Sequence, residues 1–119
     1  MLDCYGCDKE KLGDTAFITK LLDELPDVIK MHKIAPPQIV YYKGSGNPEH
    51  FDRGGISGVV IIAESHISIH TFVKQEFASI DVFSCKEFDY KMLTDYVKKE
   101  FGAENVESKF LRRGKLFVR

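Results

Sequence analysis

The sequence has little cysteine and almost no net charge, and each shortage excludes a class of protein. Its three cysteines are an odd number, so the disulfide framework of a small secreted domain is not expected. No apolar run approaches the roughly 20 residues that a membrane span needs. The start, MLDCYGCDKEK, lacks the basic segment and apolar core of a secretory signal. We therefore expect a reduced, cytoplasmic protein that does not act at a membrane.

The charge balance gives no reason to expect a nucleic-acid partner. Seventeen basic and 18 acidic residues leave a formal net charge of −1, whereas a nucleic-acid surface needs a concentrated basic patch. The chain has 119 residues, 44% of them hydrophobic, and contains no repeats. This length suits one domain, residues 1–119, which can bury roughly two thirds of its unfolded surface.

Hydrophobic periodicity predicts a mixed α+β fold. Strands are expected at residues 1–5, 38–42, 59–63, 66–72 and 78–83, with one or two more within 106–118. One helix is expected after Asp14-Thr15, with Pro26 kinking or restarting it, and a second over 89–101, with Met92 on its apolar side. This order predicts a two-layer sandwich, in which an antiparallel-rich sheet carries the helices on one face.

Two spacings are compatible with metal binding, but neither favours it. Cys4 and Cys7 form C-x-x-C, yet a structural zinc site needs four ligands and no second pair exists. His66 and His70 share one face of the expected strand, two steps apart, without the glutamate of the metalloprotease pattern. We expect no metal, and the simpler interpretation is structural in both cases.

The loop 43–55, KGSGNPEHFDRGG, matches neither glycine-rich phosphate motif. A plain loop is the simpler interpretation, although Phe51 is a large apolar residue among polar ones, which often covers something. Nearby lie the components of covalent chemistry: Ser57, Ser65, His70 and Cys85 offer nucleophiles, a base and a thiol. By composition alone these residues could equally be structural.

The local sequence around these residues resembles that of the prokaryotic S-adenosylmethionine decarboxylases, which are self-processing, pyruvoyl-dependent enzymes of polyamine synthesis. Four stretches carry the resemblance: Tyr5-Gly-Cys-Asp8, Ile56-Ser-Gly-Val-Val60, Ala63-Glu-Ser-His-Ile-Ser-Ile-His-Thr71 and Ala78-Ser-Ile-Asp-Val-Phe-Ser-Cys85. Together with a similarly placed helix over 89–101, they span nearly the whole chain. The central signature is long, so an accidental match is not expected.

The resemblance implies that the chain cuts itself between Glu64 and Ser65. Ser65 would become a pyruvoyl group, the cofactor, which forms a Schiff base with the amine of a small amino-acid substrate. His70 would be the base of the cutting step and Ser57 its assistant. Cys85 would return the proton after carbon dioxide leaves, and a thiol is mostly protonated at neutral pH. The family also implies a homodimer of cut chains, with each active site near the partner.

The match departs from the family where the substrate is bound. An aromatic is kept at Phe72, but Lys74 stands where the family has a glutamate that binds the substrate ribose. Phe51 matches the aromatic that stacks on adenine, and Glu64 is a further binding candidate. Two alternatives therefore stay open: a homologue that decarboxylates L-ornithine or L-arginine, and a non-catalytic homologue that binds an active partner and stays uncut.

Overall fold

The computed structural model describes residues 1–49 and 54–118, and shows six strands and three helices in that part of the chain. The elements are β1 (Leu2–Tyr5), α1 (Lys9–Leu12), α2 (Thr15–Val28), β2 (Gln38–Tyr42), β3 (Gly55–Ile62), β4 (Ser65–Phe72), β5 (Phe77–Phe83), α3 (Tyr90–Phe101) and β6 (Asn105–Ser108). None of these helices is long and apolar enough to cross a membrane.

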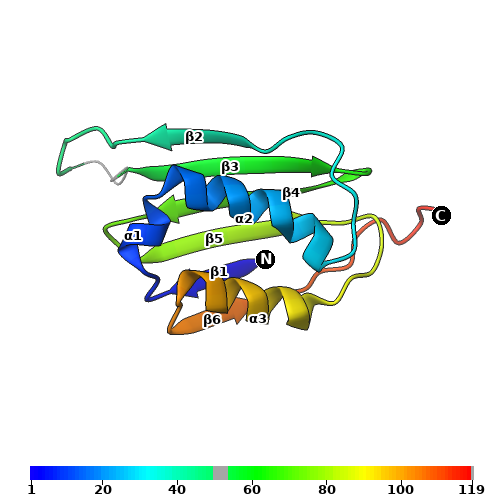
Figure 1. Ribbon diagram of the computed structural model, residues 1–119. Helices are drawn as coiled ribbons and strands as arrows, with labels where there is room; N and C mark the ends of the chain where they lie inside the picture. The colour runs from blue at the N-terminus through cyan, green and yellow to red at the C-terminus, as the bar shows by residue number, and fades with distance from the viewer. Residues whose placement is uncertain (50–53, 119) are drawn as a thin grey trace.

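The strands form one antiparallel sheet in the order β2-β3-β4-β5-β1-β6. The helices lie on one face of this sheet, with α2 over its β2–β3 side and α3 next to β6 (Figure 1). The expected two-layer α+β fold, with helices on one face, is confirmed. We call the helix side the covered face of the sheet and the other side the open face.

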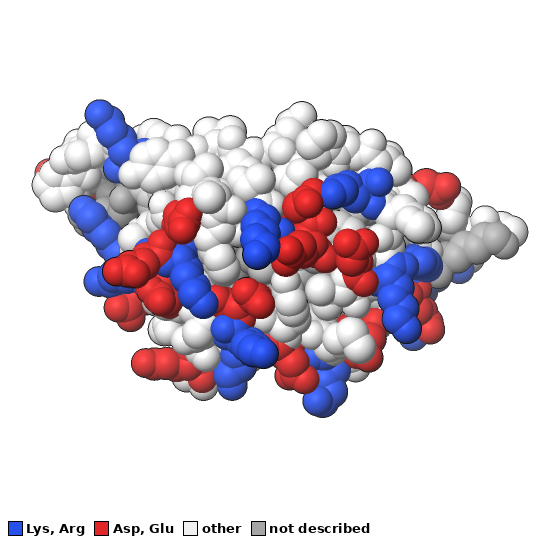
Figure 2. Space-filling view, in the orientation of Figure 1, with Lys and Arg blue, Asp and Glu red and all other residues white. Residues whose placement is uncertain are grey.

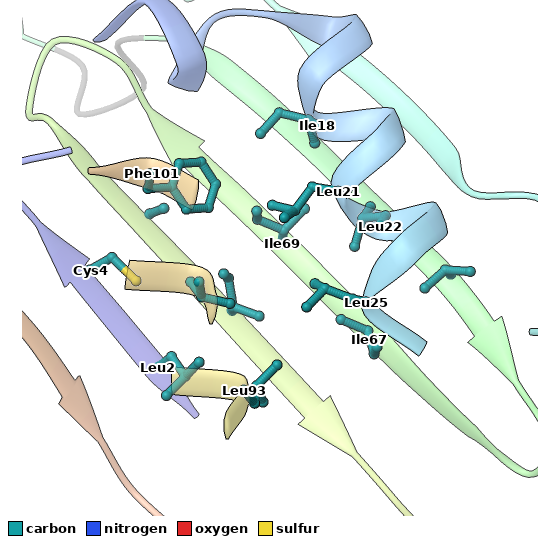
Figure 3. Packing of buried hydrophobic residues seen from close by; sticks show 14 of the residues in the cluster. Leu2, Cys4, Ile18, Leu21, Leu22, Leu25, Ile67, Ile69, Leu93 and Phe101 are labelled. Carbon is teal, nitrogen blue, oxygen red and sulfur yellow. The ribbon is translucent and has the colours of Figure 1, made fainter. Parts of the chain in front are cut away.

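The core lies between the helices and the covered face (Figure 3). Ile18, Leu21, Leu22 and Leu25 recur at the three- and four-residue spacing that places them on one side of α2, and all are buried. At β3 the contact is closest, because a Cβ added to Gly58 would lie 2.7 Å from Leu22 Cδ1. A glycine at this position therefore allows α2 to approach the sheet.

Both longer helices begin where the sequence predicts. The Asp14 carboxylate accepts a hydrogen bond from the Phe17 amide at 3.1 Å, and Asp89 accepts one from the Met92 amide at 3.0 Å. Such caps satisfy amides that have no partner within the helix, and each contributes about 1 kcal/mol. Helix α3 ends at Gly102, which adopts the left-handed conformation that glycine tolerates best.

Two expectations about these elements were wrong in detail, and one helix was not expected. Helix α2 does not restart at Pro26 but runs through it to Val28, where few residues follow that could clash or lose their pairing. The Pro26 carbonyl still accepts a hydrogen bond from the Met31 amide at 2.8 Å. Met92 is 46% exposed rather than buried. The four-residue helix α1, Lys9–Leu12, is too short for periodicity to detect.

The C-terminal region supplies one strand, β6, and the chain from 109 to 118 forms no further strand. This stretch is exposed throughout, including Leu116 at 96% and Val118 at 89%. On the helix side, basic and acidic residues are mixed over α2 and α3, while the edge at β2 carries few charges (Figure 2). The view therefore shows no large surface of one sign.

Candidate active site

The Glu64–Ser65 bond lies in the tight turn that joins β3 to β4. Ile62 pairs with Ser65, so the connection consists of Ala63 and Glu64 alone. Glu64 has φ of 59°, whereas Ala63 is not among the residues with positive φ. Two-residue hairpins favour turns with positive φ at the first position, and a side chain in this left-handed region costs about 1–2 kcal/mol. The residue whose carbonyl would be attacked is thus held in a strained conformation.

Neighbouring segments fix this turn through its backbone. The Ala63 amide donates to the His32 carbonyl at 2.8 Å, and the Ile34 amide donates to the Ile61 carbonyl at 3.0 Å. On the other side, the Cys85 thiol lies 3.8 Å from the Ala63 carbonyl oxygen. The turn is therefore held between the chain that follows α2 and the loop that follows β5.

Ser65 and Cys85 lie together at this turn. Ser65 Oγ accepts a hydrogen bond from the Cys85 amide at 2.9 Å, and the Ser65 residue is only 7% exposed. This bond orients the hydroxyl, but activation of a serine nucleophile requires a base. In residues 1–49 and 54–118, no histidine or carboxylate side chain hydrogen bonds to Ser65 Oγ. The chain thus brings together the nucleophile, the scissile peptide and the thiol, without a base.

The base candidate is paired elsewhere. Ser57 on β3 and His70 on β4 are cross-strand neighbours on the open face, and Ser57 Oγ lies 2.7 Å from His70 Nδ1. The tautomer of the histidine decides which group donates. Both residues are exposed, so the imidazole can reach a molecule that docks on the sheet.

Strand geometry keeps the two pairs apart. Ser65 and His70 are five positions apart on β4, which corresponds to about 16 Å along a strand. An odd separation also places their side chains on opposite faces. Along the strand direction, we call the end of the sheet near Ser65 and Cys85 the Ser65 end, and the end near Ser57 and His70 the His70 end. One chain alone does not bring His70 to Ser65.

Two of the expected substrate-binding residues, Phe72 and Lys74, lie at the His70 end. Phe72 is half-buried, with its ring centroid 5.5 Å from that of Phe77, and Lys74 is exposed in the turn between β4 and β5. Glu76, in the same turn as Lys74, lies 3.7 Å from Lys9 Nζ. Phe51 lies outside the described residues. Glu64 is at the Ser65 end, about a strand length away.

Two residues that position the His70 end were not singled out from the sequence. Thr71 is 3% exposed; its hydroxyl accepts the Ile56 amide at 2.9 Å and donates to the Leu12 carbonyl at 2.8 Å. A Cβ on Gly55 would lie 1.7 Å from the Thr71 carbonyl oxygen. The sequence did contain a signal for Thr71. It is a polar residue on the same face of β4 as Ile67 and Ile69, which lie in the core, so its hydroxyl needs a buried hydrogen-bond partner.

The other thiols and His66 take no part in either pair. Burial, with a smaller contribution from the nearby Cys7, raises the pKa of the Cys4 thiol to about 12. Burial likewise raises the pKa of the Cys7 thiol to about 11. Both are therefore protonated at neutral pH. His66 stacks on Phe83, with ring centroids 5.4 Å apart, and the described residues contain no group of three or more potential metal ligands.

Comparison with known proteins identifies the family. A family model described as S-adenosylmethionine decarboxylase matches residues 1–114. An S-adenosylmethionine decarboxylase proenzyme of Geobacillus sp. (strain WCH70) is 37% identical over 112 residues, which cover 94% of this chain and 82% of the relative. A proenzyme of the same description from Clostridium botulinum (strain Langeland) is 32% identical, covering 98% of this chain and 92% of the relative.

The crystal structure of the adenosylmethionine decarboxylase from Aquifex aeolicus VF5 has a similar fold. Its TM-score is 0.66 at 25% sequence identity, and the alignment covers 96% of this chain and 91% of that one. The relatives and the family model extend over almost the whole chain, in agreement with the motifs around Ser65 and Cys85. The chain belongs to the S-adenosylmethionine decarboxylase proenzyme family.

Proposed function

We propose that this chain cuts its own Glu64–Ser65 bond and that the cut form decarboxylates S-adenosylmethionine. One observation carries the proposal: a serine at a strained two-residue turn has its hydroxyl fixed by the amide of the cysteine next to it. The relatives, which are S-adenosylmethionine decarboxylase proenzymes, support the substrate. The proposal also assigns separate tasks to the two ends of the sheet.

The cutting step uses the residues of the turn. Ser65 Oγ attacks the Glu64 carbonyl carbon, the C–N bond breaks, and an ester replaces the amide. A base then removes the Ser65 α-proton, the Cβ–Oγ bond breaks, and Oγ leaves as part of the Glu64 carboxylate. The dehydroalanine that remains takes up water and loses ammonia to become the pyruvoyl group. The strain at Glu64 favours the attack, since cleavage releases the turn.

The base comes from a second copy of the chain in this proposal. His70 with Ser57 lies about 16 Å from Ser65 on the same strand and on the opposite face, so neither side chain reaches the bond of its own chain. Both are exposed on the open face. When two open faces pack in opposite directions, the His70 end of one copy approaches the exposed Ala63–Glu64 turn at the Ser65 end of the other.

The open face is suited to such packing. It is free of helices and exposes apolar side chains, with Val40 65% and Ile61 44% exposed. Val40 lies in the same cross-strand row as Ser57 and His70, so the apolar surface and the base candidate share one face. Antiparallel sheets often leave one face in water, but that face is then polar. An apolar open face favours a homodimer.

The residues fit the pyruvoyl group that the family implies, because the Cys85 amide donates to Ser65 Oγ and the Cys85 thiol lies 3.8 Å from the Ala63 carbonyl oxygen, beside the bond to be cut. The group supplies an electrophilic ketone that binds the substrate amine and takes up the electrons left by carbon dioxide. Cys85 holds the proton that returns to the product carbon. Phe72 and Lys74 of the partner, with Phe51, are the candidates for binding the rest of the substrate.

Two measurements test this proposal. An intact mass spectrum of the purified protein is expected to show two fragments that divide between Glu64 and Ser65, with the pyruvoyl mass on the second. A single uncut chain would favour the non-catalytic homologue. The release of labelled carbon dioxide is then compared for S-adenosylmethionine, L-ornithine and L-arginine. Turnover of L-ornithine or L-arginine without turnover of S-adenosylmethionine would overturn the proposed substrate. It would also indicate that Lys74, in place of the family glutamate, contributes to a change of substrate.

A further inference from the structure

The chain after β6 crosses the Ser65 end of the sheet. Lys109 continues the pairing of β6 with β1: its amide donates to the Met1 carbonyl at 2.9 Å, and the Met1 ammonium donates to the Lys109 carbonyl at 3.0 Å. The chain therefore leaves the sheet on the side of the β3–β4 hairpin, as the red trace shows in Figure 1. We call residues 109–113 the tail segment.

The tail segment contacts both sides of the loop that carries Cys85, residues 84–89. Before the loop, the Arg113 guanidinium carbon lies 4.8 Å from the centre of the Phe83 ring. After the loop, the rings of Phe110 and Tyr90 are stacked with centroids 5.3 Å apart. Cys85 thus lies in a loop whose two flanking aromatic residues are both held by the tail.

Within the loop, a third contact ties the tail to Glu87. Arg112 Nη2 lies 3.2 Å from Glu87 Oε1, and the Arg112 guanidinium also lies 5.6 Å from the Phe110 ring centre. On the opposite side, Lys86 Nζ donates to the Lys30 carbonyl at 3.0 Å. Inside the loop, Ser84 Oγ donates to the Lys86 carbonyl at 2.6 Å and accepts from the Lys86 amide at 3.1 Å. The Cys85 amide itself donates to Ser65 Oγ at 2.9 Å.

Maturation removes that last hydrogen bond. In the cutting step proposed above, Oγ leaves with the Glu64 carboxylate, so the mature chain no longer has the acceptor of the Cys85 amide. The turn at Ala63, whose carbonyl faces the thiol at 3.8 Å, is cut at the same time. The tail contacts with Phe83, Glu87 and Tyr90 are unaffected, because tail and loop both belong to the fragment that begins at residue 65.

We propose that the tail segment holds Cys85 in place in the mature enzyme, with Arg112 and Arg113 as positioning residues. The inference rests on the proposed function, since it concerns the thiol that returns the proton. Catalytic groups act only when they are held within about 0.5 Å of the productive geometry. The tail replaces an anchor that the enzyme destroys when it makes its cofactor.

The reactivity of Cys85 toward iodoacetamide reports on this position without depending on turnover. Cys85 is partly exposed, whereas Cys4 and Cys7 are buried and protonated at neutral pH, so alkylation is expected at Cys85 alone. Two truncated chains form a matched pair. Removal of residues 110–119 deletes the contacts, and removal of residues 114–119 keeps them.

In the cut protein, we expect the longer truncation to raise the alkylation rate about tenfold, which corresponds to about 1.4 kcal/mol. The shorter truncation should leave the rate unchanged. The Ser65→Ala chain provides the same test without cutting, because alanine also lacks the acceptor of the Cys85 amide. There the longer truncation should again increase the rate, so the measurement remains informative if self-cleavage never occurs.

Point variants separate positioning from folding. Arg113→Ala and Arg112→Glu are each expected to lower kcat about threefold with KM unchanged, since both contacts are exposed and modest. Adding Glu87→Arg to Arg112→Glu should restore kcat. Equal alkylation rates for both truncations, in the cut protein and in Ser65→Ala, would overturn the tail proposal. Failure of self-cleavage in the full chain would instead overturn the proposed function.

Discussion

The two ends of the sheet hold their reactive residues in different ways. At the Ser65 end the nucleophile is 7% exposed, the Ala63 amide donates to the His32 carbonyl, and the Cys85 amide donates to Ser65 Oγ. At the His70 end, Ser57 and His70 are exposed and bond to each other. A bond that is to be cut needs a fixed conformation, whereas a group that acts on another molecule needs access. The difference agrees with the proposal that His70 of one copy acts on the Glu64–Ser65 bond of another.

The largest effect is expected for Ser65→Ala, which removes the nucleophile of the Ser65 end. Without the hydroxyl no ester forms, so the chain stays uncut and decarboxylase activity is lost. Gel mobility and intact mass check the cutting step, and release of labelled carbon dioxide checks the activity. Ser68→Ala is the control, because Ser68 is on the same strand and belongs to neither reactive pair. Two fragments from Ser65→Ala would contradict the assignment of the nucleophile.

A complementation experiment tests whether the two ends meet across copies. His70→Ala alone and Ser65→Ala alone should both stay uncut. When the two variants are produced together, random pairing should allow cutting of about half of the His70→Ala chains, because their Ser65 meets an intact His70 from the other variant. Differently tagged chains make the cut species visible on one gel. Absence of any cutting in the mixture would show that His70 does not act across the dimer.

Most of the sheet could be predicted from the sequence because its pattern is strong. The alternation of Ile67 and Ile69 with His66, Ser68 and His70 identifies both faces of β4, and the structure confirms it. The break near Glu64 also separates two strands as expected. The turn type could not be predicted, since nothing in the local residues favours a positive φ at a glutamate.

The grouping of the site residues was beyond the reach of the sequence. Ser57, Ser65, His70 and Cys85 were expected as one set, but their separation into two pairs follows from strand register and length. The tail likewise showed only a mixture of basic and apolar residues. Its contact with Phe83 depends on where β6 ends relative to β5. Such long-range relations are set by tertiary packing rather than by local propensity.

Cys85→Ala should separate cutting from turnover at the Ser65 end. Alanine keeps the amide that donates to Ser65 Oγ, so the chain should still be cut. Loss of a general acid typically lowers turnover by about 10²-fold or more, and we expect a decrease of that size in kcat. Cys7→Ala is the control for loss of a thiol elsewhere. Turnover equal to the unaltered chain would exclude Cys85 as the proton donor.

The smallest effect concerns the two thiols of the core, which contrast with the partly exposed Cys85. Burial raises the pKa of Cys4 to about 12 and that of Cys7 to about 11, while a thiol in the unfolded chain titrates near about 8.5. Above that pH the unfolded state loses protons that the native state keeps. The free energy of unfolding should therefore fall as pH rises, by up to about 1.4 kcal/mol per pH unit for each buried thiol.

Urea unfolding between about pH 8.5 and about pH 9.5 measures this slope, since the tyrosines of the unfolded chain titrate near about pH 10 and contribute less in that range. Cys4→Ala should reduce the pH dependence of the unfolding free energy by the contribution of one buried thiol. This reduction is independent of how the substitution changes stability at neutral pH. If Cys4→Ala left the slope unchanged, Cys4 would have to ionise in the folded protein, and the Ser65 end would no longer hold the one reactive thiol of the chain.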